Sequence, residues 1–264
     1  MPPERETSQA DENTLDLWLA YPEDLLAAGA REACEAILGE KDLERAARYR
    51  FEQHQREFLT TRTLARTALS WHAGEAPEAW RFPTNEHGKP GIEPECGLRF
   101  NLSNSEAITV CLIARGREVG VDVEPRRRAA QIAEVARKAF SAQEREQLEA
   151  LEGEARMERA LTLWTLKEAY IKARGMGMAL PLEKISFLFG GAAGIELAAG
   201  PEVDEAPQRW RFCLLDRAGH RIALMTEQNA EADPELRVWE ARPATAPPRR
   251  LEAGKQEWFP RFSV

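Results

Sequence analysis

Long apolar runs and paired cysteines are missing from this 264-residue sequence. No segment approaches the roughly 18 consecutive apolar residues of a membrane span. The N-terminal sequence MPPERETSQADENT lacks the apolar core of a secretory signal peptide. The cysteines lie far apart, without the paired spacing of a zinc or redox site, at Cys34, Cys96, Cys111 and Cys213. We therefore expect reduced, mostly structural cysteines in a cytoplasmic protein that does not bind membranes.

Basic charge is also scarce, with 36 Lys and Arg against 44 Asp and Glu and a formal net charge of −8. Proteins that bind nucleic acids or membrane surfaces generally need a net basic face. The composition argues against both classes, although a local basic patch is compatible with it. Such a patch lies just after residue 125, as Arg126-Arg127-Arg128, with Arg137-Lys138 close by.

The predicted elements run in the order strand, helices, strands, then helices and strands again. The first strands and helices are expected at residues 15–19, 30–72, 98–102, 107–114 and 118–124, with a hairpin turn at Arg115-Gly116-Arg117. The later ones are expected at 130–140, 142–151, 154–174 with Gly175 as its C-cap, 185–189, 194–197, 209–215 and 221–226.

This order predicts two successive α+β halves, with the boundary between them near Gly120. We expect a disordered N-terminal segment over residues 1–13, an N-terminal half over 14–119 and a C-terminal half over 120–241. The tail, 242–264, is rich in proline and is expected to be irregular.

The most informative segment is Gly120-Val121-Asp122-Val123-Glu124. Alternate residues of a strand face the same side, so the valines point to the core and the two carboxylates point the other way, about 7 Å apart. Carboxylates this close repel each other unless a cation or solvent relieves them. The strand is therefore either a solvated polar face or half of a site for a hard cation such as Mg²⁺.

A predicted helix over 154–174 carries Trp164, Glu168 and Lys172 at i, i+4 and i+8, on one face. An aromatic ring, an acid and a base on one face can serve a site, and Glu168 with Lys172 can equally be a surface ion pair. Upstream, Ser141-Ala142-Gln143-Glu144 has the pattern of a capping box, with Ser141 as N-cap. A carboxylate there is stabilised in its charged form by the helix N-terminus.

Three further segments could contact a phosphate. The small polar run Asn101-Leu102-Ser103-Asn104-Ser105 follows a short strand, and Gly88-Lys89-Pro90 forms a tight turn. Arginines recur at helical spacing from Arg45 to Arg66, including Arg50 and Arg62. Each of these segments is also compatible with an ordinary turn or a solvated helix face.

In chain order, these motifs resemble those of the 4′-phosphopantetheinyl transferases of the Sfp type. The resemblance runs from Arg45 to Phe187 and ends with a Gly-x-Gly-x-x-Leu-Pro-Leu segment at 175–182. It implies a fold of two similar α+β halves related by pseudo-two-fold symmetry. It also implies transfer of 4′-phosphopantetheine from coenzyme A to a serine of an apo acyl or peptidyl carrier protein, with release of adenosine 3′,5′-bisphosphate.

The resemblance also implies roles for single residues. Asp122, Glu124 and Glu168 are similar in position to the Mg²⁺ ligands, and Glu168 also counts among the catalytic groups. Glu144 resembles the base that deprotonates the carrier serine, directly or through water. Lys172 resembles the cation near the α-phosphate of coenzyme A.

Ser103 and Lys89 resemble contacts to the 3′-phosphate region of coenzyme A, and Arg50 and Arg62 are further candidates there. The family often has histidine after this serine. Here Asn104 takes that place, and its neutral amide can donate a hydrogen bond but carries no charge.

The expected protein is a monomeric, Mg²⁺-dependent transferase of fatty acid or secondary metabolite biosynthesis. Carrier proteins are acidic, so we expect the basic residues 126–128 and 137–138 to dock them. Two alternatives use the same residues. One is a Mg²⁺-dependent hydrolase of a nucleotide pyrophosphate, and the other is a non-catalytic module that binds carrier proteins or coenzyme A.

Overall fold

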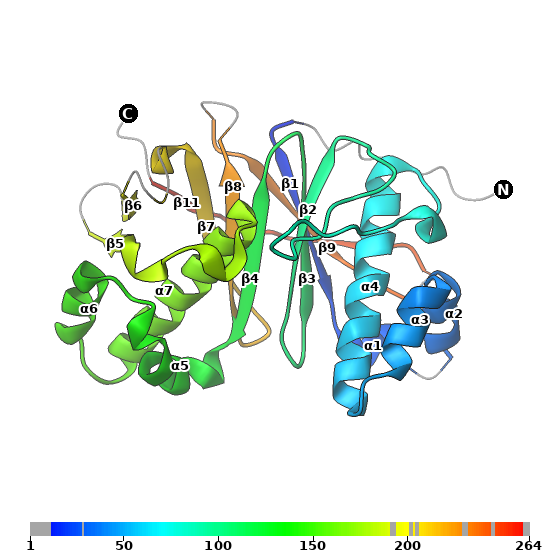
Figure 1. The fold of residues 1–264 in the computed structure, drawn as a ribbon, viewed down its shortest axis with the longest axis horizontal. Helices are drawn as coiled ribbons and strands as arrows, with labels where there is room; N and C mark the ends of the chain where they lie inside the picture. The colour runs from blue at the N-terminus through cyan, green and yellow to red at the C-terminus, as the bar shows by residue number, and fades with distance from the viewer. Residues whose placement is uncertain are drawn as a thin grey trace. The chain divides into compact units, whose positions relative to one another are not determined.

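The computed structural model describes residues 12–27, 29–190, 194–200, 203, 206–228, 232–243 and 246–260. These residues form mixed helices and sheets, which confirms the α+β prediction. The chain divides into two compact units (Figure 1). The first comprises Met1–Thr84, Pro90–Arg117 and Pro234–Ala253, and the second comprises Asn85–Lys89, Glu118–Asp233 and Gly254–Val264. The predicted disorder of residues 1–13 lies outside the described residues, except for a turn at 12–13.

The first unit contains a five-stranded sheet in the order β10-β9-β1-β3-β2. Its strands are β1 (Thr14–Ala20), β2 (Leu98–Asn104), β3 (Thr109–Arg115), β9 (Glu235–Glu240) and β10 (Arg249–Leu251). Its helices are α1 (Pro22–Leu25), α2 (Arg31–Ala36), α3 (Glu40–Ala47) and α4 (Glu52–Ala73). The long helix α4 packs against β1, β2 and β3, so its apolar side chains share a core with the sheet.

The alternation of Leu15, Leu17 and Leu19 with Asp16 and Trp18 is typical of a half-buried strand, but all seven residues of β1 are buried. The strand lies inside the sheet, antiparallel to β3 and parallel to β9. Its one carboxylate, Asp16, accepts hydrogen bonds from Arg237 Nη2 and Trp239 Nε1, both at 2.7 Å. These partners allow a charged residue to occupy a fully buried strand.

The second unit contains a four-stranded antiparallel sheet in the order β11-β7-β8-β4 and a separate β5-β6 hairpin. Its strands are β4 (Val119–Pro125), β5 (Ile185–Phe189), β6 (Ile195–Ala199), β7 (Trp210–Arg217), β8 (His220–Glu227) and β11 (Trp258–Phe259). Its helices are α5 (Ala129–Val135), α6 (Ala142–Glu149) and α7 (Gly153–Arg174). Helix α7 lies against β4 and β8, and its C-terminus is capped by Gly175 with a left-handed φ of 64°, as predicted.

Three predictions about chain organisation are wrong. Strands β3 and β4 belong to different sheets, so residues 115–117 do not join a hairpin. Strand β9 was assigned to the half 120–241, but it pairs with β1 of the first unit. The tail 242–264 was expected to be irregular, but it contributes β10 to one sheet and β11 to the other. Pattern along the chain indicates strands but does not fix their partners, which lie far away in sequence.

Helix α7 approaches β4 unusually closely at Gly120. A Cβ atom on this glycine would lie 2.0 Å from the carbonyl oxygen of Ala169 and 2.5 Å from the backbone nitrogen of Ala173. A side chain of any size would therefore push the helix off the strand. The missing side chain allows the helix to rest directly on the part of β4 that precedes Asp122 and Glu124.

Within the described part of the chain, no helix combines the length and apolar composition needed to cross a bilayer.

Candidate active site in the second unit

The carboxylates of β4 face helix α7. Val119, Val121 and Val123 are buried on the other side of the strand, as the alternation predicts. Asp122 is only 5% exposed and Glu124 is partly buried, because α7 covers the face from which they project. The alternative of a solvated polar face is therefore wrong.

Helix α7 presents the predicted acid, base and aromatic ring to these carboxylates. Lys172 Nζ lies 2.7 Å from Asp122 Oδ1, and Trp164 Nε1 donates to Glu124 Oε1 at 3.0 Å. Residues spaced by four on a helix share a face, so Glu168 lies between these two contacts along the helix. The two sequence motifs therefore meet in one cluster within the second unit.

The cluster disfavours negative charge. Burial, together with the nearby charges of Asp122 and Glu124, raises the pKa of Glu168 to about 7, and Lys172 opposes the shift. Burial and the charge of Asp122 also raise the pKa of Glu124, and its partners Trp164, Arg128 and Lys172 oppose this shift. The carboxylates thus repel one another in a partly desolvated place, where a bound cation would be strongly attracted.

No set of three Asp, Glu, His or Cys side chains among the described residues already has the arrangement of a metal site. Two of the three predicted metal ligands already have cationic partners. Lys172 engages Asp122, while Arg128 Nη1 donates to Glu124 Oε2 at 3.0 Å. The donor types nevertheless fit a hard divalent cation, which prefers carboxylate oxygens. The metal assignment of Asp122, Glu124 and Glu168 stays a prediction. A cation that binds there would have to displace the side chains of Lys172 and Arg128 from these carboxylates.

Mg²⁺ is expected to raise the melting temperature of the protein by several degrees. A cation that binds only the folded state stabilises it by about 2.7 kcal/mol at a hundredfold excess over its Kd, and each kcal/mol shifts the melting temperature by roughly 2–4 °C in a chain of this size. Thermal unfolding in EDTA and in millimolar MgCl₂ measures the effect. Asp122→Ala should lose it, and an equal shift in that variant would contradict the assignment.

Glu144 lies in the predicted capping box, but it does not reach a surface. Ser141 Oγ accepts from Glu144 N at 3.2 Å, and Glu144 Oε2 accepts from Ser141 N at 2.7 Å. The residue has no exposed surface and pairs with Lys167 Nζ at 2.7 Å. Burial lowers the pKa of Lys167, and the Glu144 carboxylate opposes the shift. A general base must come within hydrogen-bond reach of its substrate, so this arrangement does not support the predicted role of Glu144 as the base.

Lys89 connects the loop at residues 85–89 to the C-terminal end of helix α7. Its Nζ lies 2.5 Å from Glu118 Oε2 and 2.7 Å from the carbonyl oxygen of Ala173. The neighbouring Asn85 donates its amide to the carbonyl oxygen of Gly175 at 2.9 Å. Lys89 therefore belongs to the same unit as Glu168 and Lys172, and its predicted contact with coenzyme A stays a prediction.

The other predicted contacts to coenzyme A lie in the first unit. Ser103 is buried and Asn104 is exposed at the end of β2. Arg62 is half-buried, with Asp42 Oδ1 at 3.4 Å and its guanidinium over the rings of Phe58 and Phe82, and burial lowers its pKa. Arg50 is exposed, with its guanidinium 5.7 Å from the ring centroid of Phe51. Arg62 thus already has structural partners, whereas Arg50 and Asn104 face solvent.

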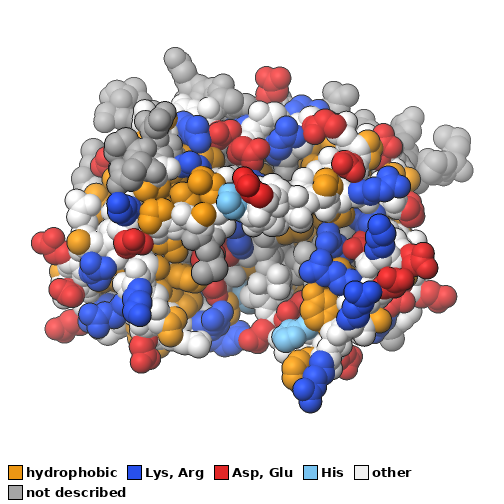
Figure 2. Space-filling model, in the orientation of Figure 1, with side chains coloured by type: hydrophobic (Ala, Val, Ile, Leu, Met, Phe, Trp, Pro, Cys, Tyr) orange, Lys and Arg blue, Asp and Glu red, His pale blue; other side chains and the backbone are white. Residues whose placement is uncertain are grey.

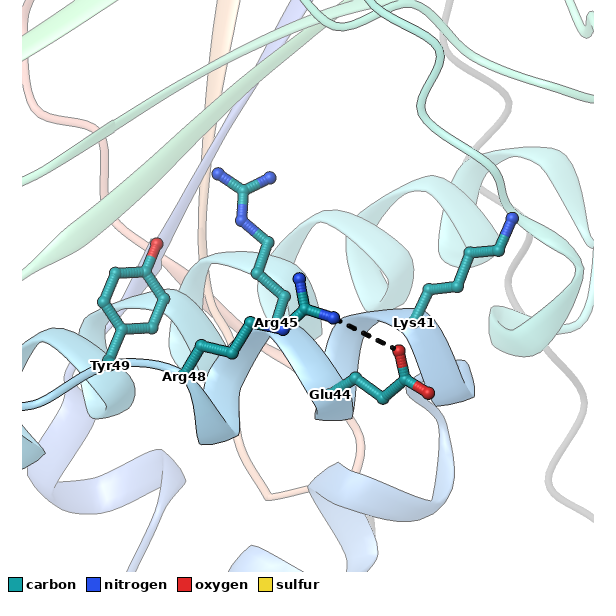
Figure 3. Close-up of a pocket in the computed structure, with 5 residues that line it drawn as sticks. All are labelled: Lys41, Glu44, Arg45, Arg48 and Tyr49. Atoms are coloured by element: carbon teal, nitrogen blue, oxygen red, sulfur yellow. Dashed lines mark ion pairs between the residues drawn. The ribbon is translucent and has the colours of Figure 1, made fainter.

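A basic pocket of the first unit was not among the predicted site residues. It has a volume of about 600 Å³ and is lined by Lys41, Glu44, Arg45, Arg48 and Tyr49 on and just after α3 (Figure 3). Among these five residues, Arg48 forms an ion pair with Glu44, with its Nη2 3.8 Å from Glu44 Oε2. Lys and Arg side chains also gather over α3 and α4 on the face shown in Figure 2. The spacing of the basic residues at 41, 45 and 48 on a helix could have identified the pocket.

The chain is similar to several known proteins. The model of the 4′-phosphopantetheinyl transferase superfamily matches residues 118–225. The 4′-phosphopantetheinyl transferase HetI of Nostoc is 33% identical over 63% of this chain and 71% of its own length. A 4′-phosphopantetheinyl transferase of Bacillus subtilis is 28% identical over 71% of this chain and 84% of its own. A crystal structure of a holo-(acyl-carrier-protein) synthase from Bacillus anthracis, 16% identical, aligns with 43% of this chain and 96% of its own at a TM-score of 0.36.

Proposed function

The chain belongs to the 4′-phosphopantetheinyl transferase superfamily, and on this premise we propose its reaction. It transfers 4′-phosphopantetheine from coenzyme A to a serine hydroxyl of an apo acyl or peptidyl carrier protein. The reaction requires Mg²⁺ and releases adenosine 3′,5′-bisphosphate. The observation that carries this proposal is the cluster of Asp122, Glu124, Glu168 and Lys172 between β4 and α7. All four residues lie within the matched segment.

The reaction needs one bond formed, one broken and one proton moved. The serine oxygen bonds to the β-phosphorus of coenzyme A, and the bond from that phosphorus to the leaving adenosine 3′,5′-bisphosphate breaks. Mg²⁺, when bound by Asp122, Glu124 and Glu168, would neutralise charge on the pyrophosphate oxygens. Lys172 adds a positive charge beside the same carboxylates, where it can stabilise charge that develops on the leaving group.

The serine proton is best accepted by Glu168. Its carboxylate is partly exposed beside Asp122 and Lys172, so it can come within hydrogen-bond reach of a substrate hydroxyl. Lys172 stabilises the ionised carboxylate of Glu168 before the proton arrives. Glu144, in contrast, is fully enclosed by its partners.

In the first unit, the basic pocket is a candidate site for a phosphate group. Lys41, Arg45 and Arg48 supply three positive charges around a volume that a phosphate can enter. Asn104 can add a neutral hydrogen bond at an exposed strand end. Arg50, Arg62, Lys89, Ser103 and Asn104 stay the predicted contacts to coenzyme A.

The test is the intact mass of an apo acyl carrier protein after incubation with this protein, coenzyme A and Mg²⁺, with a parallel sample in EDTA. A gain of one phosphopantetheine that EDTA abolishes is the expected result. No gain across a panel of apo carriers, despite measured binding of coenzyme A, would identify a binding module instead. Consumption of coenzyme A without a carrier would identify a hydrolase.

Carrier docking is proposed for the basic residues after β4, with a correction to the predicted set. Arg126 is already engaged by Glu158 at 2.6 Å and Asp216 at 3.1 Å, and Arg128 is engaged by Glu124. Arg137 and Lys138 are exposed just after α5, close in sequence to Val135, which is 65% exposed. These two charges can attract an acidic carrier although the whole chain is negative.

Reversing Arg137 and Lys138 to Glu is expected to raise the KM for the carrier about tenfold, since the loss of about 1.4 kcal/mol of binding energy changes affinity by that factor. The KM for coenzyme A should not change. Steady-state kinetics at low ionic strength measures both constants, because salt screens such charges. Arg81→Glu, an exposed change in the first unit, is the matched control. An unchanged carrier KM in the double variant would refute the docking site.

A further inference from the structure

We infer that Glu144 and Lys167 form a buried ion pair that positions helix α7, and that Glu144 acts on the reaction only through this pair. The inference rests on the proposed transferase function, and it gives the two residues a role different from that of an acid or base. Both side chains have no exposed surface, and the carboxylate and ammonium groups lie 2.7 Å apart.

The Glu144 carboxylate is held by three segments of the second unit. Its Oε2 accepts from the backbone nitrogen of Ser141 at 2.7 Å, at the start of α6. Its Oε1 accepts from the backbone nitrogen of Phe187 at 2.8 Å, on β5. Its third partner, Lys167, lies on α7. These contacts direct both carboxylate oxygens inward, so neither is available to a substrate hydroxyl.

The Lys167 ammonium is equally constrained. Besides Glu144, it donates to the carbonyl oxygen of Leu182 at 2.7 Å and to that of Ile185. The side chain therefore crosses from α7 to the segment that leads into β5. A charged group without exposure is tolerated only where such partners replace its water.

The pair fixes the rotation of α7 about its own axis. Lys167 directly precedes Glu168, and successive residues of an α-helix point about 100° apart. When Lys167 is anchored toward β5 and α6, Glu168 must point toward β4, together with Trp164 and Lys172. Because α7 packs closely against Gly120, the helix has little room to rotate about its axis. Loss of the anchor should therefore misplace Glu168 and Lys172 without removing either.

The experiment compares the variants Glu144→Gln, Lys167→Met and the double variant. Melting temperature and kcat for carrier modification are measured at a temperature where every variant is folded by circular dichroism. Glu146→Gln, an exposed change on the same helix, is the matched control. Each single variant leaves a buried charge without its partner, so we expect a fall of roughly 10 °C in melting temperature and about a hundredfold fall in kcat.

The double variant decides between the roles. Removing both charges leaves no unpaired charge, so a positioning pair predicts a melting temperature above that of either single variant and a kcat within about tenfold of the parent. If Glu144 were the base, kcat would stay about 10²–10⁴-fold low although the fold is restored. If the pair were merely structural, the folded single variants would keep the parent kcat. Either of these two results would overturn the inference.

Failure of the proposed function would look different. A parent protein that modifies no carrier would refute the transferase assignment whatever the variants do. The parent and control Glu146→Gln must both be active before the variant rates are compared. The thermal coupling between the two substitutions still reports on the ion pair in an inactive parent, so the two failures are separable.

Discussion

Replacing Glu168 by alanine is expected to slow carrier modification by at least about a thousandfold, which corresponds to roughly 4 kcal/mol of lost transition-state stabilisation. The variant removes both a proposed Mg²⁺ ligand and the proposed base, each of which contributes several kcal/mol or several powers of ten in rate. Asp122→Ala should have a comparable effect, because it removes a second ligand and the partner of Lys172. The mass shift of the apo carrier, followed over time, measures both rates.

The fold of the Glu168 variant should survive. Burial and neighbouring carboxylates raise the pKa of Glu168 to about 7, so the folded protein disfavours its charge, and removal of that charge costs little. A lost rate can then be separated from unfolding by circular dichroism. Glu154→Ala, an exposed change on the same helix, is the control and should keep the parent rate. A Glu168 variant that keeps a tenth of the parent rate would refute both roles of this residue.

The helices and strands of both units could largely be predicted from local patterns. Helix α7 matches the expected range 154–174 with its Gly175 cap, because amphipathic spacing and capping are local properties. The pairing of β9 with β1 could not be predicted in this way. It depends on contacts such as Asp16 with Arg237, which are separated by most of the chain.

The sequence predicted which residues form the candidate site, but it did not predict how deeply they are buried or which side chains contact them. The alternation of β4 correctly placed Asp122 and Glu124 on one face, but only the fold reveals that α7 covers this face and raises the pKa of Glu124. Glu144 shows the opposite case. Its capping-box spacing correctly predicted its backbone contacts, yet the partner that encloses it, Lys167, lies on another helix and leaves no mark in the local sequence.

Gly120→Ala is expected to destabilise the protein by about 3–5 kcal/mol, beyond the 1–3 kcal/mol typical of overpacked cores. The added methyl carbon would lie 2.0 Å from the carbonyl oxygen of Ala169 and 2.5 Å from the nitrogen of Ala173, and both are backbone atoms that cannot turn aside. The helix must then move away from β4, which separates Lys172 from Asp122 as well. Chemical denaturation measures the loss of stability.

The same substitution tests whether helix placement, rather than the residues alone, creates the site. Every proposed ligand and Lys172 remain in Gly120→Ala, so a folded variant should still lose the thermal shift caused by Mg²⁺ and most of its transfer activity. Gly91→Ala is the matched control, because its added methyl carbon would meet nothing closer than 3.5 Å. If Gly120→Ala kept the parent stability and Mg²⁺ response, the close packing of α7 on β4 would not be needed for the site. The arrangement of Asp122 against Lys172 would then have to be maintained by contacts elsewhere on the helix, of which the Glu144–Lys167 pair is the nearest candidate.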